Sequence, residues 1–257
     1  MKRQMALGAV VLTLVAGGTA LSHKALAGGA TASGQNNGGL SISPALIEHN
    51  AQPGTLATMT VANRSAAPLA VTVTPRPWVQ DTAGKVSPNR RKTLPGVSVS
   101  QSKFTLAPGA EQPLTVTLGA APAGGAEYGA IEVVGLPTDA ATRKGLVLGY
   151  RVVGTVRVLP AAPKASLSAG RITASKGTAV LAIKNTGNTI DPVSGNLSVK
   201  DARGTRNLTV KPVKILPGNA IKLPLGAKLT KGAASVKVTL KMRGKTAISM
   251  TKKFTVK

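Results

Sequence analysis

Side chains able to perform acid–base, nucleophilic or metal chemistry are few in this chain of 257 residues. His49 stands beside Glu48, but a zinc site needs several convergent ligands and a catalytic triad needs a nucleophile and an orienting acid. The acidic residues between positions 40 and 163 show no glycosidase motif. They are Glu48, Asp81, Glu111, Glu127, Glu132 and Asp139. Cysteine, a G-x-S-x-G nucleophile motif and a phosphate-cradling glycine loop are all absent from the sequence. We therefore predict a protein that is not an enzyme, with no catalytic residue, metal site or cofactor.

Positive charge is the second chemical feature of the sequence, and it is unevenly distributed along the chain. Lys and Arg number 33 against 8 Asp and Glu, giving a formal net charge of +25. Residues 164–257 hold 19 of these bases and two of the acids, and a polycation of this kind is attracted to anionic polymers and surfaces. The alternative is a solvated surface that only keeps the protein soluble. The predicted polyanion-binding set is Lys237, Lys241, Arg243, Lys245, Lys252 and Lys253.

A second basic cluster lies between two prolines in the first half of the chain. Arg90, Arg91 and Lys92 follow one another there, and we predict a long basic loop. Specific nucleic-acid binding is not expected, because aromatic stacking residues are scarce among the bases. Aromatic residues make up 2% of the chain, and residues 164–257 contain Phe254 alone.

Short strands must position these side chains. Val, Ile, Leu and Thr alternate with polar residues in short runs, and Gly, Pro and Asn turns separate the runs. Between positions 40 and 63, a first run over 40–47 contains Pro44, which favours an edge strand, and an alternating run over 56–61 follows. We expect His49 in a turn and Trp78 as a plug of a core or sheet edge rather than a ligand platform.

About seven strands are expected in each half of the mature chain, which is the number in an immunoglobulin-type sandwich. In the first half the expected strands cover 40–47, 56–61, 69–79, 97–106, 114–118, 128–135 and 146–159, with a loop over 86–95. Tyr128 opens its strand, where a corner tyrosine would lie. In the second half they cover 165–173, 178–184, 195–200, 206–215, 220–225, 234–242 and 246–256.

The predicted fold class is all-β: two immunoglobulin-like β-sandwich domains in tandem after a signal peptide. Lys2-Arg3, an apolar run and Ala25-Leu26-Ala27 form the charged region, hydrophobic region and cleavage site of a secretory leader. The predicted divisions are a signal peptide at 1–27, a flexible lead at 28–39, a sandwich at 40–159, a linker at 160–164 and a basic sandwich at 165–257.

The chain resembles two families of exported proteins. The segments LSISPALIE, TVANRSAAPLAVTV, FTLAPGAEQPLTVTL and EYGAIEVVG are similar to the first domain of periplasmic pilus-assembly chaperones. Together with IKNTGNTIDPVSGNLSVKDARG and ILPGNAIKLPL, they also resemble WxL-interacting surface proteins. These resemblances imply paired immunoglobulin-like domains, export, and binding to cell-surface proteins or peptidoglycan.

Two features of these families have no counterpart in the sequence. Pilus chaperones hold the carboxylate of a subunit with an arginine in the first strand and a lysine in the last strand of their first domain. Here positions 40–47 contain no base, and Arg151 and Arg157 do not clearly match the lysine, so no anchoring site is carried over. WxL-interacting proteins usually end in a membrane helix, and we expect no transmembrane helix in this mature chain.

These observations predict an exported, non-enzymatic binding protein of the cell envelope, either secreted or held in a periplasm-like compartment. It would engage a surface protein or an anionic wall polymer. The alternative is an assembly chaperone for pilus or surface subunits that acts by β-strand addition, with the exported partner at the Pro44 edge or along 146–159. A third hypothesis, an exported hydrolase with a degenerate site, lacks the necessary histidine and cysteine.

Overall fold

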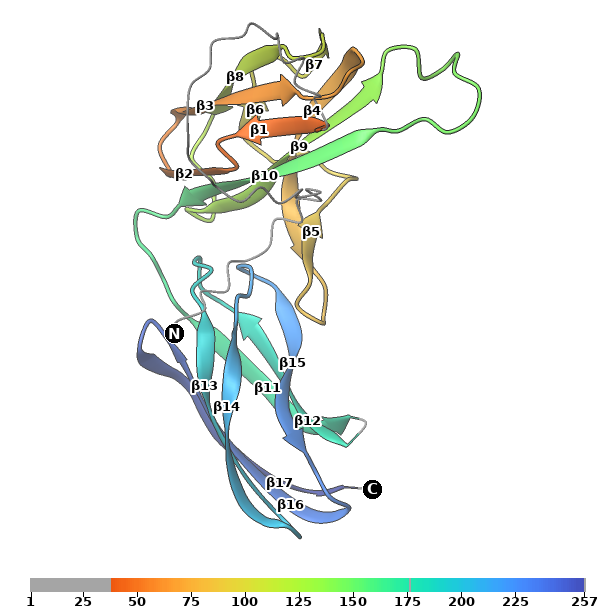
Figure 1. The fold of residues 1–257 in the computed structure, drawn as a ribbon. Coiled ribbons are helices and arrows are strands. Elements are labelled where there is room, and N and C mark those ends of the chain that lie inside the picture. The colour runs from red at the N-terminus through yellow and green to blue at the C-terminus, as the bar shows by residue number, and fades with distance from the viewer. Residues whose placement is uncertain (1–37, 176, 257) are drawn as a thin grey trace, which may run out of the picture.

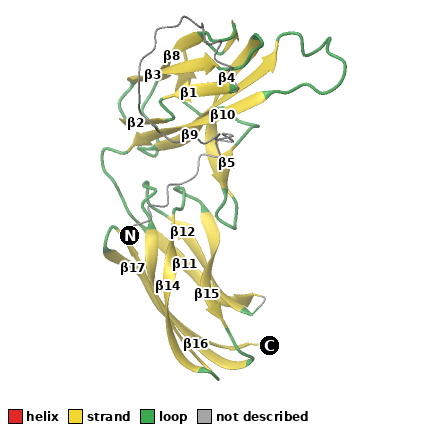
Figure 2. Ribbon diagram, in the orientation of Figure 1, coloured by secondary structure: helices red, strands yellow, loops and turns green. Residues whose placement is uncertain are grey.

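The computed structural model describes residues 38–175 and 177–256. Within these ranges the chain forms 17 strands and no helix (Figures 1 and 2). The described part of the chain accordingly holds no helix long and apolar enough to cross a membrane. The predicted signal peptide and all but the last two residues of the lead lie outside the described residues.

The first sandwich packs two sheets against each other. One sheet has the order β1-β3-β8-β6, and the other has the order β2-β10-β9-β4-β5, with β7 paired to β4. The strands are β1 (Leu40–Ser43), β2 (Leu46–Asn50), β3 (Gly54–Asn63), β4 (Leu69–Gln80), β5 (Val86–Pro88), β6 (Val97–Val99), β7 (Lys103–Leu106), β8 (Glu111–Leu118), β9 (Glu127–Pro137) and β10 (Tyr150–Leu159).

The second sandwich contains seven strands in a three-stranded sheet and a four-stranded sheet, β11-β12-β15 and β14-β13-β16-β17. The strands are β11 (Leu167–Ser175), β12 (Thr178–Asn185), β13 (Val193–Asp201), β14 (Gly204–Val213), β15 (Ala220–Lys228), β16 (Gly232–Met242) and β17 (Lys245–Val256). The predicted all-β fold with two sandwiches in tandem is therefore confirmed.

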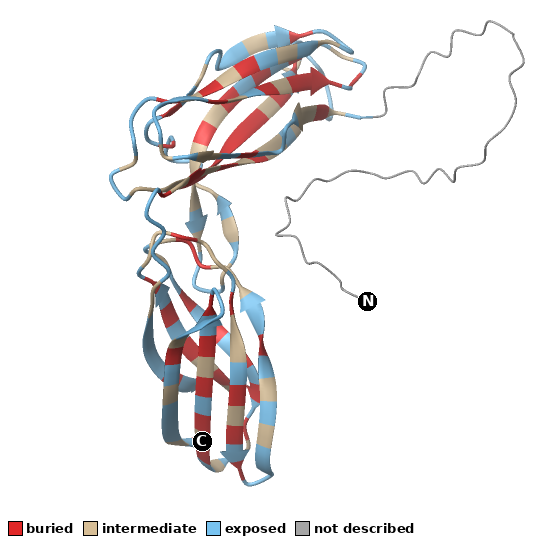
Figure 3. Ribbon diagram, turned by 90° about the vertical axis from the view of Figure 1, so that its left-hand side faces the viewer, coloured by how far each residue is buried: buried red, intermediate tan, exposed pale blue. Residues whose placement is uncertain are grey.

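Alternation of apolar and polar residues builds each core. In β15, Ile221, Leu223 and Leu225 are buried, while Lys222 and Lys228 between and after them are exposed. A period of two places such residues on opposite faces of a sheet. Figure 3 shows the resulting bands of buried and exposed residues along the strands of the second sandwich.

Two runs that were predicted as single strands are divided between the sheets of the first sandwich. The run over 40–47 forms β1, which pairs with β3, and β2, which pairs with β10 in the other sheet. Pro44 lies between them and has no N–H to donate to a continuous ladder. The run over 97–106 likewise forms β6, which pairs with β8, and β7, which pairs with β4.

Three further expectations were wrong at the level of single segments. His49 lies in β2 rather than in a turn, because the strand continues beside β10. The expected loop over 86–95 begins with β5, which pairs with β4 and leaves only a short turn after Pro88. The expected strand over 146–159 begins only at Tyr150, where its pairing with β9 starts.

A buried asparagine closes the corresponding strand in each sandwich. The amide of Asn63, at the end of β3, donates to the carbonyl oxygens of Ala67 at 2.8 Å and Leu106 at 2.9 Å. The amide of Asn185, at the end of β12, donates to those of Thr189 and Ile215, both at 2.7 Å. Each asparagine therefore joins two segments of its domain that are distant in sequence.

The two sandwiches are joined by polar contacts as well as by the linker. The Gln80 amide donates to the carbonyl of Lys214 at 2.9 Å, and its oxygen accepts from the backbone amide of Leu216 at 2.9 Å. The backbone amide of Lys222 donates to the carbonyl of Thr82 at 2.7 Å. The turn between β4 and β5 thus contacts the second domain, as Figure 1 shows.

Candidate functional site

Strand β10 has an edge that is only partly covered. Its partner β2 pairs with residues 155–159, so among the residues that the structure describes, 150–154 have a sheet neighbour only on the β9 side. The Thr155 amide donates to the carbonyl of Ala45, which lies toward β2. Because backbone groups of alternate residues point to the same side of a strand, those of Arg151 and Val153 face the uncovered edge. An unpaired edge of this kind is a template for another strand.

Exposed apolar side chains lie in the loop just before this edge. Leu146 is 95% exposed and Leu148 is 63% exposed in the loop that precedes β10. They share the even-numbered register of Tyr150 and Val152, whose side chains pack against the core. A strand continued backwards from Tyr150 would therefore place both leucines on the apolar face. The long β9–β10 loop projects from the sandwich in Figure 2.

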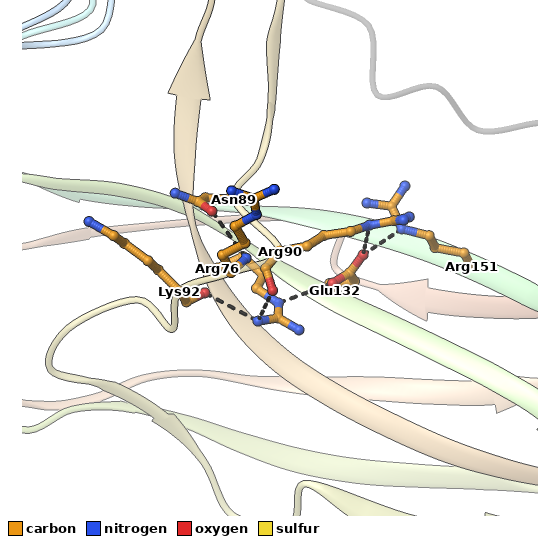
Figure 4. Close-up of polar contacts among 7 residues, drawn as sticks. Arg76, Asn89, Arg90, Lys92, Glu132 and Arg151 are labelled. Carbon is orange, nitrogen blue, oxygen red and sulfur yellow. Dashed lines mark hydrogen bonds and ion pairs between the residues drawn. The ribbon is translucent and has the colours of Figure 1, made fainter.

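A buried carboxylate lies on the opposite face of the same strands (Figure 4). Glu132 of β9 is 4% exposed, and its two oxygens accept from three arginines. Nε of Arg76 is 3.1 Å from Oε2, whereas Nε of Arg90 and Nε of Arg151 are 3.2 Å and 2.5 Å from Oε1. The three arginines come from β4, from the turn after β5 and from β10.

Burial and ion pairing have opposite effects on the pKa of Glu132. Burial raises it, but hydrogen bonds and charge from Arg151, Arg76 and Arg90 outweigh burial, so the pKa lies below its ordinary value. The carboxylate is therefore ionised at neutral pH, and one negative charge faces three positive ones. The cluster carries an excess of positive charge beside the uncovered edge of β10.

The predicted basic loop has a defined structure. Nη1 of Arg76 donates to the carbonyl oxygens of Arg90 at 2.9 Å and Lys92 at 3.2 Å. The Asn89 side chain accepts from the backbone amide of Arg91 at 3.1 Å. The loop is therefore a tight turn held against β4, and it brings Arg90 to Glu132.

The junction of the two domains contains a hollow of about 380 Å³. Arg157 lines it and is paired with Glu48 at 3.3 Å, and Arg243 lines it and is paired with Asp191 at 2.6 Å. The charges of these two arginines are thus already neutralised in part. The residues of β1 and β2 that line the hollow include no base, so the arginine that pilus chaperones have in their first strand has no counterpart here.

Tyr128 also lines this hollow, and its position differs from the expectation of a corner tyrosine. Its hydroxyl donates to the carbonyl of Asn188 in the second domain at 3.0 Å, rather than to its own domain. Burial and the nearby charge of Asp191 raise its pKa. Trp78 is half-buried in β4 beside Pro88.

The predicted polyanion-binding residues do not form one cluster. Lys237 and Lys241 are exposed on the outer face of β16, and Lys253 shares that face because it pairs with Ser235. Lys252 pairs with the buried Val236, so it lies on the opposite side of the sheet at its edge. Arg243 lies in the turn between β16 and β17, and Lys245 begins β17. The ion pair of Arg243 is in the domain junction.

The outer face of this sheet is polar and contains a hollow of about 470 Å³. Its lining includes the side chains of Asn196, Ser198, Asn207, Thr209, Lys237 and Thr239.

Both acids of the second domain are engaged internally. Asp201 accepts from Arg206 at 2.7 Å and from Arg203 at 3.3 Å, and Asp191 pairs with Arg243. Burial alone would raise the pKa of Asp201, but backbone hydrogen bonds and the two arginines hold it well below its ordinary value. The lysines of the outer face therefore have no carboxylate partner within the described part of the domain.

The described residues contain no group of three or more His, Cys, Asp or Glu side chains placed to hold a metal ion. Sequence reasoning noted Glu132 only as an acid without a motif, and it did not predict the arginine cluster. Its one signal is an isolated acid within the apolar strand AIEVVG.

No protein-family model matches the chain, and no curated protein matches it. Solved structures do match. A chain of the chaperone–tip adhesin complex of CFA/I fimbriae biogenesis gives a TM-score of 0.53 at 14% identity, covering 84% of this chain and 98% of that chain. The class 5 fimbriae chaperone CfaA gives 0.51 at 17% identity, covering 83% and 98%. The chain is thus similar in fold to fimbrial chaperones, whereas the resemblance to WxL-interacting proteins stays a prediction.

Proposed function

We propose that this protein is an exported, non-enzymatic assembly chaperone that holds a partner protein by β-strand addition at β10. The observation that carries the proposal is the uncovered edge of residues 150–154, preceded by the exposed Leu146 and Leu148. Backbone hydrogen bonds along an edge supply affinity, and apolar side chains on one face fill alternate positions of the partner. The fold similarity to fimbrial chaperones supports the same function.

The partner is proposed to be an exported surface or pilus subunit that exposes apolar surface before assembly. The predicted signal peptide favours export of the chaperone into the same envelope compartment. The carboxylate grip of pilus chaperones is not part of the proposal, because Arg157 in the domain junction is already paired with Glu48.

Site-specific crosslinking tests strand addition, since the chain contains no cysteine and each introduced thiol is unique. We expect Leu148→Cys, carrying a photo-crosslinker, to capture one defined exported protein in the native envelope. The control is Val79→Cys, at another exposed apolar residue, which is 39% exposed. The Leu146→Asp/Leu148→Asp variant should lose the complex while retaining its β-sheet circular dichroism. Equal capture from Val79→Cys, or a complex that survives the double substitution, would argue against the proposal.

Anionic polymer binding by the second domain is a second proposal, favoured by the internal pairing of its two acids. Lys237, Lys241 and Lys253 would supply the contacts, and affinity should fall steeply as salt rises. The three lysines would be changed to glutamine and binding to heparin measured across a salt series. Glutamine at Lys184 and Lys222, exposed on the other sheet, is the control. Equal loss of affinity per lysine removed in the two sets would indicate diffuse attraction rather than a binding face.

A further inference from the structure

The two faces of β10 offer different chemistry to an added strand. Tyr150 and Val152 share the apolar, core-side face, whereas Arg151 lies on the outer face with the Glu132 cluster. Leu148, in the loop before β10, would join the apolar face if the strand continued backwards. A strand added beside residues 150–154 would alternate its own side chains between these faces. Residues directly across from each other in neighbouring strands lie about 5 Å apart. One outward side chain of the partner would therefore lie within reach of Arg151.

The guanidinium groups of Arg90 and Arg151 lie side by side, because both contact the same oxygen of Glu132 through Nε. Their Nη groups have no hydrogen-bond partner among the described residues. Arg76 differs, because its Nη1 is occupied by two carbonyl oxygens of the basic turn. Nη2 of Arg76 also has no hydrogen-bond partner among the described residues, but the Arg76 side chain is only 20% exposed. The accessible free donors of the cluster are therefore mainly those of Arg90 and Arg151, whose side chains are 64% and 37% exposed.

The cluster also carries a net positive charge, which favours an anionic partner group. Glu132 is the one carboxylate that pairs with Arg90 or Arg151 within the described chain, and it is shared with Arg76. Arg91 and Lys92 add two exposed positive charges in the adjoining turn. Planar guanidinium donors match the two oxygens of a carboxylate, and charge-assisted bonds of this kind are short and strong.

We propose that Arg151 and Arg90 select a partner strand that carries an Asp or Glu on its outward face, opposite the alternating apolar residues that face Leu148 and Tyr150. This inference rests on strand addition at β10 and specifies the chemistry of the added strand. A diffuse polyanion is a less suitable occupant, because the donors are fixed beside a strand edge rather than spread over a face.

The test uses synthetic peptides and the full chain. Each fluorescent seven-residue probe carries Val at alternate positions and Ser between them, with one Ser replaced by Asp or by Asn. The replacement is placed in turn at each outward position, so that the register need not be known. Fluorescence anisotropy at one ionic strength gives the affinity. We expect the best Asp peptide to bind about 10-fold more tightly than its Asn counterpart, as a charge-assisted hydrogen bond would provide.

Substitutions assign this preference to the cluster. Arg90→Gln and Arg90→Gln/Arg151→Gln should reduce the Asp preference to about 2-fold or less, with little effect on the Asn peptide. Arg143→Gln is the matched control, because Arg143 pairs with Asp139 in the loop before β10 and not with Glu132. Arg90 is the more exposed of the two arginines, so the single variant keeps the test interpretable if the double variant folds poorly.

The outcomes separate the two proposals. Equal binding of Asp and Asn peptides, lost in Leu146→Asp/Leu148→Asp, would overturn the charge selection and leave strand addition intact. An Asp preference that persists without both arginines would also overturn it, because the carboxylate would then be bound elsewhere. Absence of binding by every peptide would overturn strand addition together with the selection that depends on it.

Discussion

Replacing the buried asparagines with alanine should destabilise one domain at a time. In Asn63→Ala, the carbonyl of Leu106 and the backbone amide of Ser65 lose their side-chain partner, whereas the carbonyl of Ala67 keeps the Ser65 hydroxyl at 3.1 Å. A buried polar group without a partner costs about 1–3 kcal/mol. We therefore expect a loss of about 3 kcal/mol in the free energy of unfolding.

Asn185→Ala should have a similar effect on the second domain. The carbonyl oxygens of Thr189 and Ile215 and the backbone amide of Gly187 lose their contacts with this side chain. Asn63 and Asn185 are both fully buried, so the two losses should agree to within about a factor of two.

Urea unfolding can separate these effects, because the single tryptophan, Trp78, lies in the first domain. Its fluorescence follows that domain, while circular dichroism follows both. With urea slopes of about 1–3 kcal/mol per M, the fluorescence midpoint of Asn63→Ala should fall by about 1–3 M. In Asn185→Ala the larger change should appear in circular dichroism. Asn207→Ala, at an exposed position, is the control. A loss below about 1 kcal/mol for both buried asparagines would refute the reasoning.

Three other changes have defined outcomes. Gln80→Ala should remove both of its hydrogen bonds to the second domain, and small-angle scattering should show a broader range of interdomain distances; an unchanged profile would contradict this. Because the pKa of Glu132 is lowered from 4.5, its ion pairs stabilise the fold above about pH 4.5, and this contribution disappears as the pH falls through the lower, folded-state value. Glu132→Gln should cost about 2 kcal/mol at pH 7, because a hydrogen bond to a charged group contributes about 1.5–3 kcal/mol and the arginines are partly exposed. It should also flatten that acid-side fall in chemical denaturation, and an unchanged pH profile would contradict it. Gly195→Ala should lower the melting temperature by several degrees, because its Cβ would lie 2.0 Å from the carbonyl oxygen of Thr239, whereas Gly124→Ala, in open space, should leave it unchanged.

Short apolar runs bounded by turn residues were enough to predict all seven strands of the second sandwich, although β11 alternates little and buries only Ile172. In β15 and β16 nearly every second residue is apolar and buried, and turn residues separate the strands. The first sandwich was harder to predict because its strands change sheets. The run over 97–106 has apolar residues at both ends, and nothing local indicates that Val99 pairs with β8 while Phe104 pairs with β4.

The candidate site could be predicted in part. The segment 146–159 was predicted as a place for an added strand because it is the longest strand pattern of the first half. Local sequence does not show that β2 covers only its second half. The arginine cluster depends on the register of β9 with β4 and β10, which brings Arg76 and Arg151 to Glu132 across long sequence separations. Contacts of this kind arise from tertiary structure, so a linear sequence motif does not reveal them.

The edge strands of the two sandwiches differ in how readily they can pair with another copy of the chain. At β17 the charged Lys252 is directed to the core side of the strand, a device that discourages edge-to-edge pairing. The uncovered part of β10 has leucines at its approach instead. At low salt a net charge of +25 keeps copies apart, but at about 1 M salt repulsion extends only about 3 Å. We therefore expect concentrated, partner-free protein to associate through β10 in high salt, so low ionic strength suits its storage.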